Sequence, residues 1–228
     1  MSHWHAHRYG YLFSSLILLF VFFPLAEKMA GHILLDVVFV WVVFTSFWAV
    51  NENRRGVVAS ITILVLVVVG AADLHQFGAI DWGIGQQLSF FSDVLLLAFL
   101  TIATVAVLWD VLSSRDVNAD KVWGAISVYV LMGVSWGILY SLIGRYYPES
   151  FNLPTDLAEK MKSPGADTMI YYSFVTLSTL GYGDITPAVK TTRVLSALEA
   201  LTGQIYLAVL VARLVAIHMT GSKPDNAG

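Results

Sequence analysis

The chain of 228 residues contains no cysteine and few charged residues. The absence of cysteine excludes a disulfide framework and a thiolate metal site. Only 13% of the residues are charged and 57% are hydrophobic, whereas a soluble domain has about a quarter charged and about half apolar. The net charge of -3 is small and indicates no nucleic-acid partner. This composition is typical of a membrane protein.

Lysine and arginine are absent from one long interval, between Arg55 and Arg115. A voltage-sensing helix needs several of them, about three to four gating charges per subunit. The same interval carries acids at Asp93 and Asp110. We therefore expect no steep voltage dependence, and we expect Asp93 to cap a helix near the membrane interface.

Long hydrophobic runs, in contrast, are abundant. A bilayer core of about 30 Å needs roughly 20 mostly apolar residues per helical span. A short helix at about 167–178 cannot span and leads into a non-helical segment, which predicts a re-entrant pore loop. The first apolar run lacks a cleavage site and is expected to remain as a span. We predict an all-α membrane protein with six transmembrane helices, at about 9–26, 32–50, 56–72, 88–112, 122–144 and 189–219.

The most specific motif follows the short helix: residues 179–184 read TLGYGD. This string resembles the selectivity-filter signature TxGYGD of potassium channels at every defined position. The resemblance implies that backbone carbonyls replace the hydration shell of a permeant potassium ion, and it implies no other cofactor. Gly181 and Gly183 are expected to adopt positive φ. A glycine-rich turn is the alternative reading. The implied filter residues are Thr179, with its hydroxyl, Leu180, Gly181, Tyr182 and Gly183.

Residues around this string are expected to support it. Many potassium channels carry an aromatic pair before the filter, and some carry a glutamate where this chain has valine. Without that acid, we expect Asp184 to accept a hydrogen bond from the Tyr172 hydroxyl, with an aromatic packing cuff as the alternative. We expect Asp167 to be the N-cap of the short helix, whose C-terminus directs partial negative charge at the pore. The predicted support residues are Tyr171, Tyr172, Val175, Thr176 and Asp184.

The last span also resembles the inner helix of potassium channels. Gly203 follows Gly181 by 22 residues, which is similar to the spacing of the family's hinge glycine. A glycine in a helix interior costs about 1 kcal/mol relative to alanine. We expect Gly203 to act as a hinge at which the helix bends, with close helix packing as the alternative. The family register implies that the cavity and gate are lined by Gln204, Leu207, Val211 and Val215. Ordinary helix packing is the alternative for the three aliphatic residues.

Two charged residues lie inside the last span. An ionised side chain at membrane depth costs roughly 2.5 kcal/mol or more, so each should pair or reach water. We expect Glu199 to support the short helix. Arg213 should reach the interface or pair with Asp110 or Asp116. A gating role is the alternative for both.

The domain organisation follows from these spans. Residues 1–114 form a four-helix membrane domain without gating arginines, residues 115–220 form the pore domain, and residues 221–228 form a short tail. The tail is expected to hold no ligand-binding domain. Histidines at positions 3, 5 and 7 belong to a solvated tail, with metal binding or pH sensing as alternatives. Lysine and arginine favour the side of both termini, which we take as cytoplasmic in a multi-pass plasma-membrane protein, the prokaryotic inner membrane.

One filter string per chain requires several chains, and the resemblance implies a homotetramer. The chain is thus similar to the prokaryotic six-span, one-pore-loop potassium channels, without a voltage sensor. No nucleophile–base constellation points to an enzyme. Three alternatives stay open: a weakly selective cation channel, a regulatory subunit of another channel, and an unrelated transporter, which usually shows paired broken helices. An unidentified regulatory subunit would be a further partner.

Overall fold

The computed structural model describes residues 8–22, 85–114, 119–155 and 165–221. The second and third predicted spans, the histidines at positions 3, 5 and 7, and residues 156–164 lie outside this part. The described part is mostly helical. Its α-helices are α1 (Arg8–Phe22), α4 (Gly85–Ser113), α5 (Ala119–Tyr146), α7 (Ala166–Leu177) and α8 (Lys190–Gly221).

Three of the described helices are long and apolar enough to cross a membrane. These segments are Phe90–Ser113 in α4, Ala119–Tyr146 in α5 and Lys190–Ala216 in α8. They agree with the fourth, fifth and sixth predicted spans, and α1 contributes the shorter apolar segment Tyr9–Leu18. Three apolar helices of this kind suggest a membrane protein.

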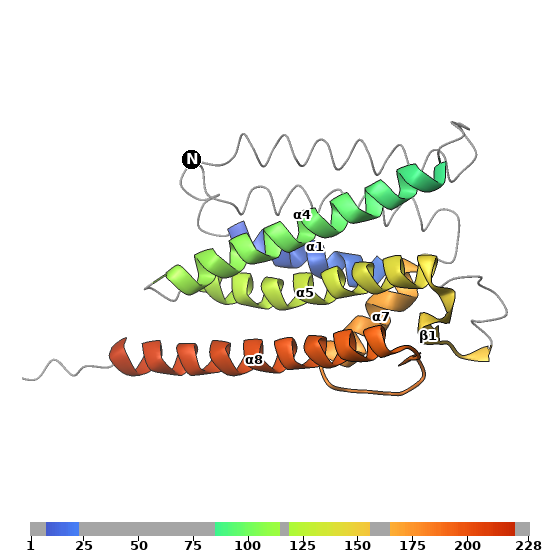
Figure 1. The fold of residues 1–228 in the computed structure, drawn as a ribbon. Helices are drawn as coiled ribbons and strands as arrows, with labels where there is room; N and C mark the ends of the chain where they lie inside the picture. The colour runs from blue at the N-terminus through green and yellow to red at the C-terminus, as the bar shows by residue number, and fades with distance from the viewer. Residues whose placement is uncertain (1–7, 23–84, 115–118, 156–164, 222–228) are drawn as a thin grey trace, which may run out of the picture.

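Helices α1, α4 and α5 pack side by side around one hydrophobic core (Figure 1). The core takes Tyr9 and Leu12 from α1, Leu100 from α4 and Leu131 from α5, all of them buried. A Cβ added at Gly124 of α5 would lie 3.0 Å from Val111 and from the Tyr9 ring. The small residue therefore lets three helices meet closely at this point.

Helix α7 lies between α5 and α8 at one end of the molecule (Figure 1). A Cβ added at Gly137 of α5 would lie only 2.6 Å from the Cα atom of Ile170 and 2.9 Å from its backbone nitrogen. Only glycine therefore allows the two helix backbones to approach this closely. A second cluster of buried residues fixes the same end, and its members are Tyr140, Phe151, Met169, Tyr172 and Ile185.

A small sheet ties the segment after α5 to the segment before α8. After the 3-10 helix η3 (Pro148–Ser150), strand β1 (Phe151–Asn152) pairs antiparallel with β2 (Thr186–Pro187), with Phe151 opposite Pro187. The Ser150 carbonyl accepts the Ala188 N–H at 2.9 Å and the Thr192 hydroxyl at 2.9 Å. The segment between α7 and α8 is thus anchored at its far end.

The start of α7 differs from the prediction. Its N-cap is Gly165, in extended conformation and without a side-chain cap hydrogen bond, so Asp167 is not the cap. A Cβ at Gly165 would collide with the Asp167 carboxylate. Asp167 lies in the first turn of α7, close to the partial positive end of the helix.

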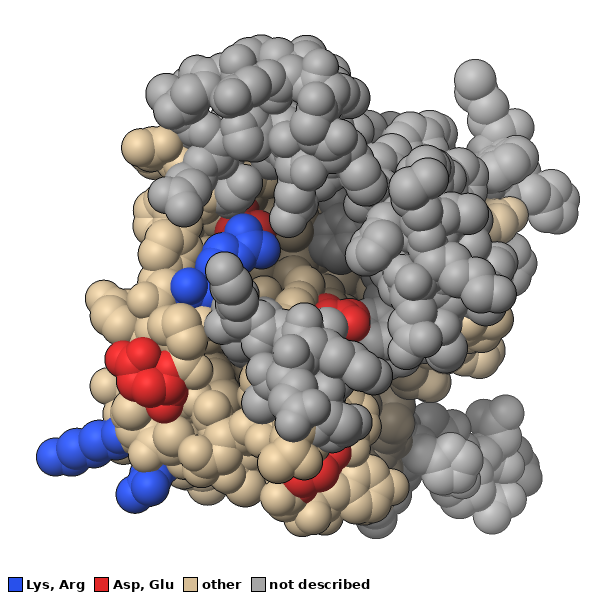
Figure 2. Space-filling view, turned by 90° about the vertical axis from the view of Figure 1, so that its right-hand side faces the viewer, with Lys and Arg blue, Asp and Glu red and all other residues tan. Residues whose placement is uncertain are grey.

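Helix α8 leaves much of its apolar surface uncovered in the single chain. The end-on view shows charged side chains only in separate patches on the described surface (Figure 2). Apolar surface on this scale is covered by lipid or by another polypeptide. The exposed large apolar residues of α8 are Val194, Leu198, Leu201, Ile205, Leu207, Val209, Val211 and Val215.

Candidate functional site

The candidate site is the non-helical string 179–184 between the end of α7 and β2. Positive φ occurs at alternate residues: 58° at Thr179, 61° at Gly181 and 77° at Gly183. The prediction of positive φ for the two glycines is confirmed, and Thr179 is an addition. In an ordinary strand successive residues point to opposite sides. A left-handed residue at every second position changes this alternation, so that successive carbonyls can share one side.

Backbone N–H groups at the start of the string bond to the last turn of α7. The Val175 carbonyl accepts the N–H of Leu180 at 2.9 Å and that of Gly181 at 3.2 Å. The N–H of Thr179 donates to the Thr176 carbonyl at 2.9 Å. No hydrogen bond among the described residues ends on the carbonyls of Leu180, Gly181 or Tyr182. These oxygens are therefore available to a ligand.

The whole string is surface in one chain. Every residue from 179 to 184 is exposed, and the residues Leu180 and Tyr182 are 55% and 66% exposed. By contrast, Val175 behind it is buried and Thr176 is half-buried. The support side of the string is thus built by α7, while its other side is open.

Asp184 bonds to a different tyrosine than predicted. The Tyr171 hydroxyl donates to Asp184 Oδ2 at 2.8 Å, whereas Tyr172 lies 2.6 Å from the Ser196 hydroxyl of α8. The predicted Tyr172–Asp184 bond is therefore wrong. Adjacent residues of a helix project about 100° apart, and Tyr172 is turned into the buried cluster with Tyr140 and Phe151. Tyr171, which is exposed, faces the string.

We expect Tyr171 to titrate at unusually high pH. The hydrogen bond to Asp184 raises the pKa of Tyr171 to about 12, above the ordinary value of about 10. Since the folded pKa is raised, the stability that this bond contributes is present below about pH 10 and is lost as pH rises through about 12.

Phenolate absorbance measures this titration as the difference between the unmodified protein and Tyr171→Phe. Asp184→Asn should return the pKa of Tyr171 towards about 10, because the charged acceptor is gone. Tyr172→Phe is the matched control and should leave this component unchanged. A Tyr171 titration near pH 10 in the unmodified protein, about its ordinary value, would contradict the assignment.

The Thr179 end of the string meets α8. The Gln204 amide nitrogen donates to the Thr179 hydroxyl at 3.3 Å. Gln204, Leu207, Val211 and Val215 are all exposed in the single chain and recur at helical spacing. The structure thus brings the amide to the string and places the other three further along α8.

Gly203 lies where α8 crosses the end of α7. It is buried, and an added Cβ would collide with the Leu177 carbonyl oxygen and lie 3.0 Å from Leu177 Cδ1. Helix α8 continues without interruption through this position. Of the two explanations for this glycine, the described contacts support close packing.

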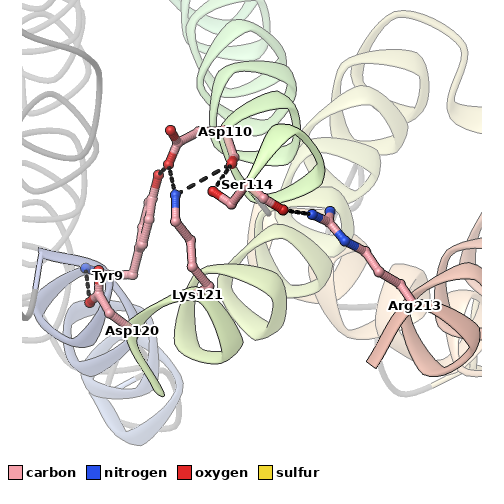
Figure 3. Close-up of polar contacts among 6 residues, drawn as sticks. All are labelled: Tyr9, Asp110, Ser114, Asp120, Lys121 and Arg213. Carbon is pink, nitrogen blue, oxygen red and sulfur yellow. Dashed lines mark hydrogen bonds and ion pairs between the residues drawn. The ribbon is translucent and has the colours of Figure 1, made fainter. Parts of the chain in front are cut away.

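A polar cluster joins the start of α1, the end of α4, the start of α5 and the C-terminal part of α8 (Figure 3). Lys121 Nζ lies 2.5 Å from Asp110 Oδ2, and the Tyr9 hydroxyl donates to the same carboxylate. Arg213 donates to the Ser114 carbonyl, just after the end of α4. The expected Arg213–Asp110 pair is therefore replaced, because the helix end offers Arg213 a partially negative carbonyl. The other expected partner, Asp116, lies outside the described residues.

Asp93 also has a partner that the sequence did not reveal. Its carboxylate lies 2.7 Å from Arg145, in the last turn of α5. The predicted capping role is wrong, because α4 begins at Gly85 and has no acidic residue in its first turn. Asp93 instead joins α4 to α5 by an ion pair. The sequence signal that could have indicated this ion pair is the placement of opposite charges near the start of one span and the end of the next.

Comparison with known proteins bears on residues 127–219, which match the model of a family described as "Ion channel". Protein LctB of Bacillus caldotenax is 27% identical over 122 residues, covering 53% of this chain and 90% of that protein. Its counterpart in Geobacillus stearothermophilus is 28% identical over 126 residues, covering 52% and 93%. Two-pore potassium channel 4 of Arabidopsis thaliana is 47% identical over 45 residues, covering 20% and 16%. No solved structure matches significantly.

The matched residues include most of α5 and all of α7, the string and β2, and they reach α8 as far as position 219. The candidate site therefore lies entirely inside the region of similarity. The match suggests a transport protein and not an enzyme. Together with three apolar helices of spanning length, it supports an ion channel in a membrane.

Proposed function

We propose that this chain forms a potassium-selective channel that conducts passively through the string 179–184. The carrying observation is the alternation of positive φ along this string, with backbone carbonyls left free of hydrogen bonds among the described residues. A dehydrated potassium ion regains its oxygen contacts from rings of such carbonyls. We assign this role to Thr179, Leu180, Gly181 and Tyr182.

A ring requires several chains, and we propose a homotetramer. The exposed side chains of Leu180 and Tyr182 support this, because a tyrosine braced against a neighbouring subunit would hold the string in place. The open face of α8 supports it too, since Gln204, Leu207, Val211 and Val215 could then line a central cavity. The match to a protein named as a potassium channel supports the choice of ion.

The remaining topology belongs to the same proposal. Six spans would place both termini in the cytoplasm of a plasma-membrane protein, with α7 as a re-entrant pore helix. Steep voltage gating is not proposed, because no lysine or arginine lies between Arg55 and Arg115. An unidentified regulatory subunit would be a further partner in this proposal.

Ion flux tests the proposal. Purified protein in liposomes loaded with potassium should pass potassium much faster than sodium, because the carbonyl ring replaces the hydration shell of the larger ion. The measurement compares the two fluxes at equal gradients, with protein-free liposomes as the control. Equal fluxes would replace the proposal with a weakly selective cation channel. A well-folded protein without flux would favour a regulatory subunit.

A further inference from the structure

Glu199 is a carboxyl group buried completely between three helices. It lies on α8, and its side chain is fully inaccessible in the single chain. The Ser173 hydroxyl of α7, which is equally buried, forms a short hydrogen bond with Glu199 Oε1. The same hydroxyl lies 2.7 Å from the carbonyl oxygen of Gly133 on α5. One serine thus links α5, α7 and α8.

The number of protons in this chain of contacts decides the state of Glu199. A serine hydroxyl donates only one hydrogen bond. The contact with Gly133 must use the serine proton, because a backbone carbonyl has none to give. The contact with Ser173 then requires a proton on Glu199. If Glu199 were ionised, its oxygen and the Ser173 oxygen would lie at hydrogen-bond distance with no proton between them, because the serine proton is used for Gly133.

The surroundings of Glu199 favour the uncharged form. The ion pairs between described residues join Lys121 with Asp110 and Arg145 with Asp93, and Glu199 takes part in neither. Among the described residues, the titratable groups on which Glu199 acts are tyrosines, Tyr129 and Tyr140 of α5 and Tyr172 of α7. An unpaired buried carboxylate is costly to desolvate. A neutral acid avoids that cost.

The second carboxyl oxygen has a ready donor beside it. Glu199 Oε2 and the Tyr140 hydroxyl are both buried, and neither reaches hydrogen-bond geometry with a partner in the part of the chain that the structure describes. Tyr140 nevertheless lies close enough for the Glu199 carboxyl to act on its hydroxyl. In the neutral acid Oε2 is the carbonyl oxygen, so a small rotation of either side chain would let Tyr140 donate to it.

We propose that Glu199 is a neutral carboxylic acid that donates to Ser173, and that this proton-dependent link positions α8 against α7. Ser173 lies two residues before Val175, whose carbonyl holds the N–H groups of Leu180 and Gly181. Ionisation would turn a donor into an acceptor and set it against the serine oxygen. The link would then open behind the string. Only this consequence for flux rests on the proposed channel function.

Infrared spectroscopy tests the proton directly. At pH 8 an ordinary glutamate, with a pKa of about 4.3, is almost fully ionised. Protein in lipid should still show a hydrogen-bonded carboxylic-acid band at this pH. Labelling with ¹³C-glutamate should shift the band, which separates glutamate from aspartate, and Glu199→Gln should remove it. Asp120→Asn is the matched control, because Asp120 is a buried acid that accepts the Tyr9 N–H at 2.9 Å.

Two further results distinguish a positioning proton from mere packing. Ser173→Ala should move the band to higher frequency, because the hydrogen bond is lost. Potassium flux of the unmodified protein should fall at the alkaline pH that abolishes the band, while Glu199→Gln, whose amide still donates, should keep its flux there. Absence of a glutamic-acid band at pH 8 in the labelled, unmodified protein would overturn the proposal. That measurement stands whether or not the protein conducts.

Discussion

Gly181→Ala should abolish potassium flux through the reconstituted protein. Gly181 has φ of 61°, and a left-handed conformation costs a residue with a Cβ about 1–2 kcal/mol. A ring of four chains would accumulate about 4–8 kcal/mol, which corresponds to roughly a thousandfold or more in the population of the ordered ring. The added methyl meets no atom of the described residues within 4 Å in the single chain, so the expected loss comes from the backbone. Flux in potassium-loaded liposomes measures it.

Gly10→Ala is the matched control for this change. Gly10 is a helical glycine of α1 whose added Cβ also meets nothing within 4 Å, and its φ is not positive. Flux should therefore survive at Gly10 and disappear at Gly181, with both proteins folded as judged by size-exclusion chromatography. Undiminished potassium flux in Gly181→Ala would show that ions do not pass along this string.

The sequence predicted the parts of this structure that depend on local chemistry. Runs of apolar residues located α4, α5 and α8 because a helix of spanning length needs nearly continuous apolar composition. The positive φ of Gly181 and Gly183 was predictable because glycine is the residue that tolerates it. The short helix α7 was found because it is apolar, too short to span and followed by glycines.

Contacts between helices could not be predicted in the same way. Tyr171 and Tyr172 are chemically identical neighbours, and only the rotation of α7 against α5 decides which one faces Asp184. The ion pair of Asp93 with Arg145 depends on how α4 and α5 are aligned. Both features depend on tertiary packing, which no local pattern of the sequence encodes.

The partners of polar side chains that have several candidates nearby were the hardest feature to predict from the sequence. Arg213 was expected either to reach the interface or to pair with Asp110 or Asp116, since opposite charges attract most strongly at short range. In the structure Asp110 is already engaged by Lys121 and Tyr9, while the end of α4 presents a carbonyl to Arg213. When several groups can bind the same side chain, their positions in the fold decide which one does. Residue type alone therefore did not predict the partner of Arg213.

Gly203→Ala gives the second large effect, and its sign separates the two explanations of this glycine. If Gly203 only allows α8 to bend, alanine should stabilise the helix by about 1 kcal/mol per chain. If it permits close packing, the new methyl collides with the Leu177 carbonyl oxygen and lies 3.2 Å from the Leu177 carbonyl carbon. Overpacking of this kind costs about 1–3 kcal/mol. We expect destabilisation, measured as a lower unfolding temperature in lipid nanodiscs.

The nature of the colliding atoms allows a sharper test. A clash with a side chain can be relieved by shortening it, whereas the Leu177 carbonyl is fixed by the end of α7. Leu177→Ala should therefore fail to rescue Gly203→Ala, although it removes the Cδ1 atom that would lie 3.0 Å away. Gly10→Ala supplies the control, since an unobstructed helical glycine should gain stability on the same change. A rise in the unfolding temperature for Gly203→Ala equal to that for Gly10→Ala would restore the hinge, because it would show that α8 can move away from α7 without cost.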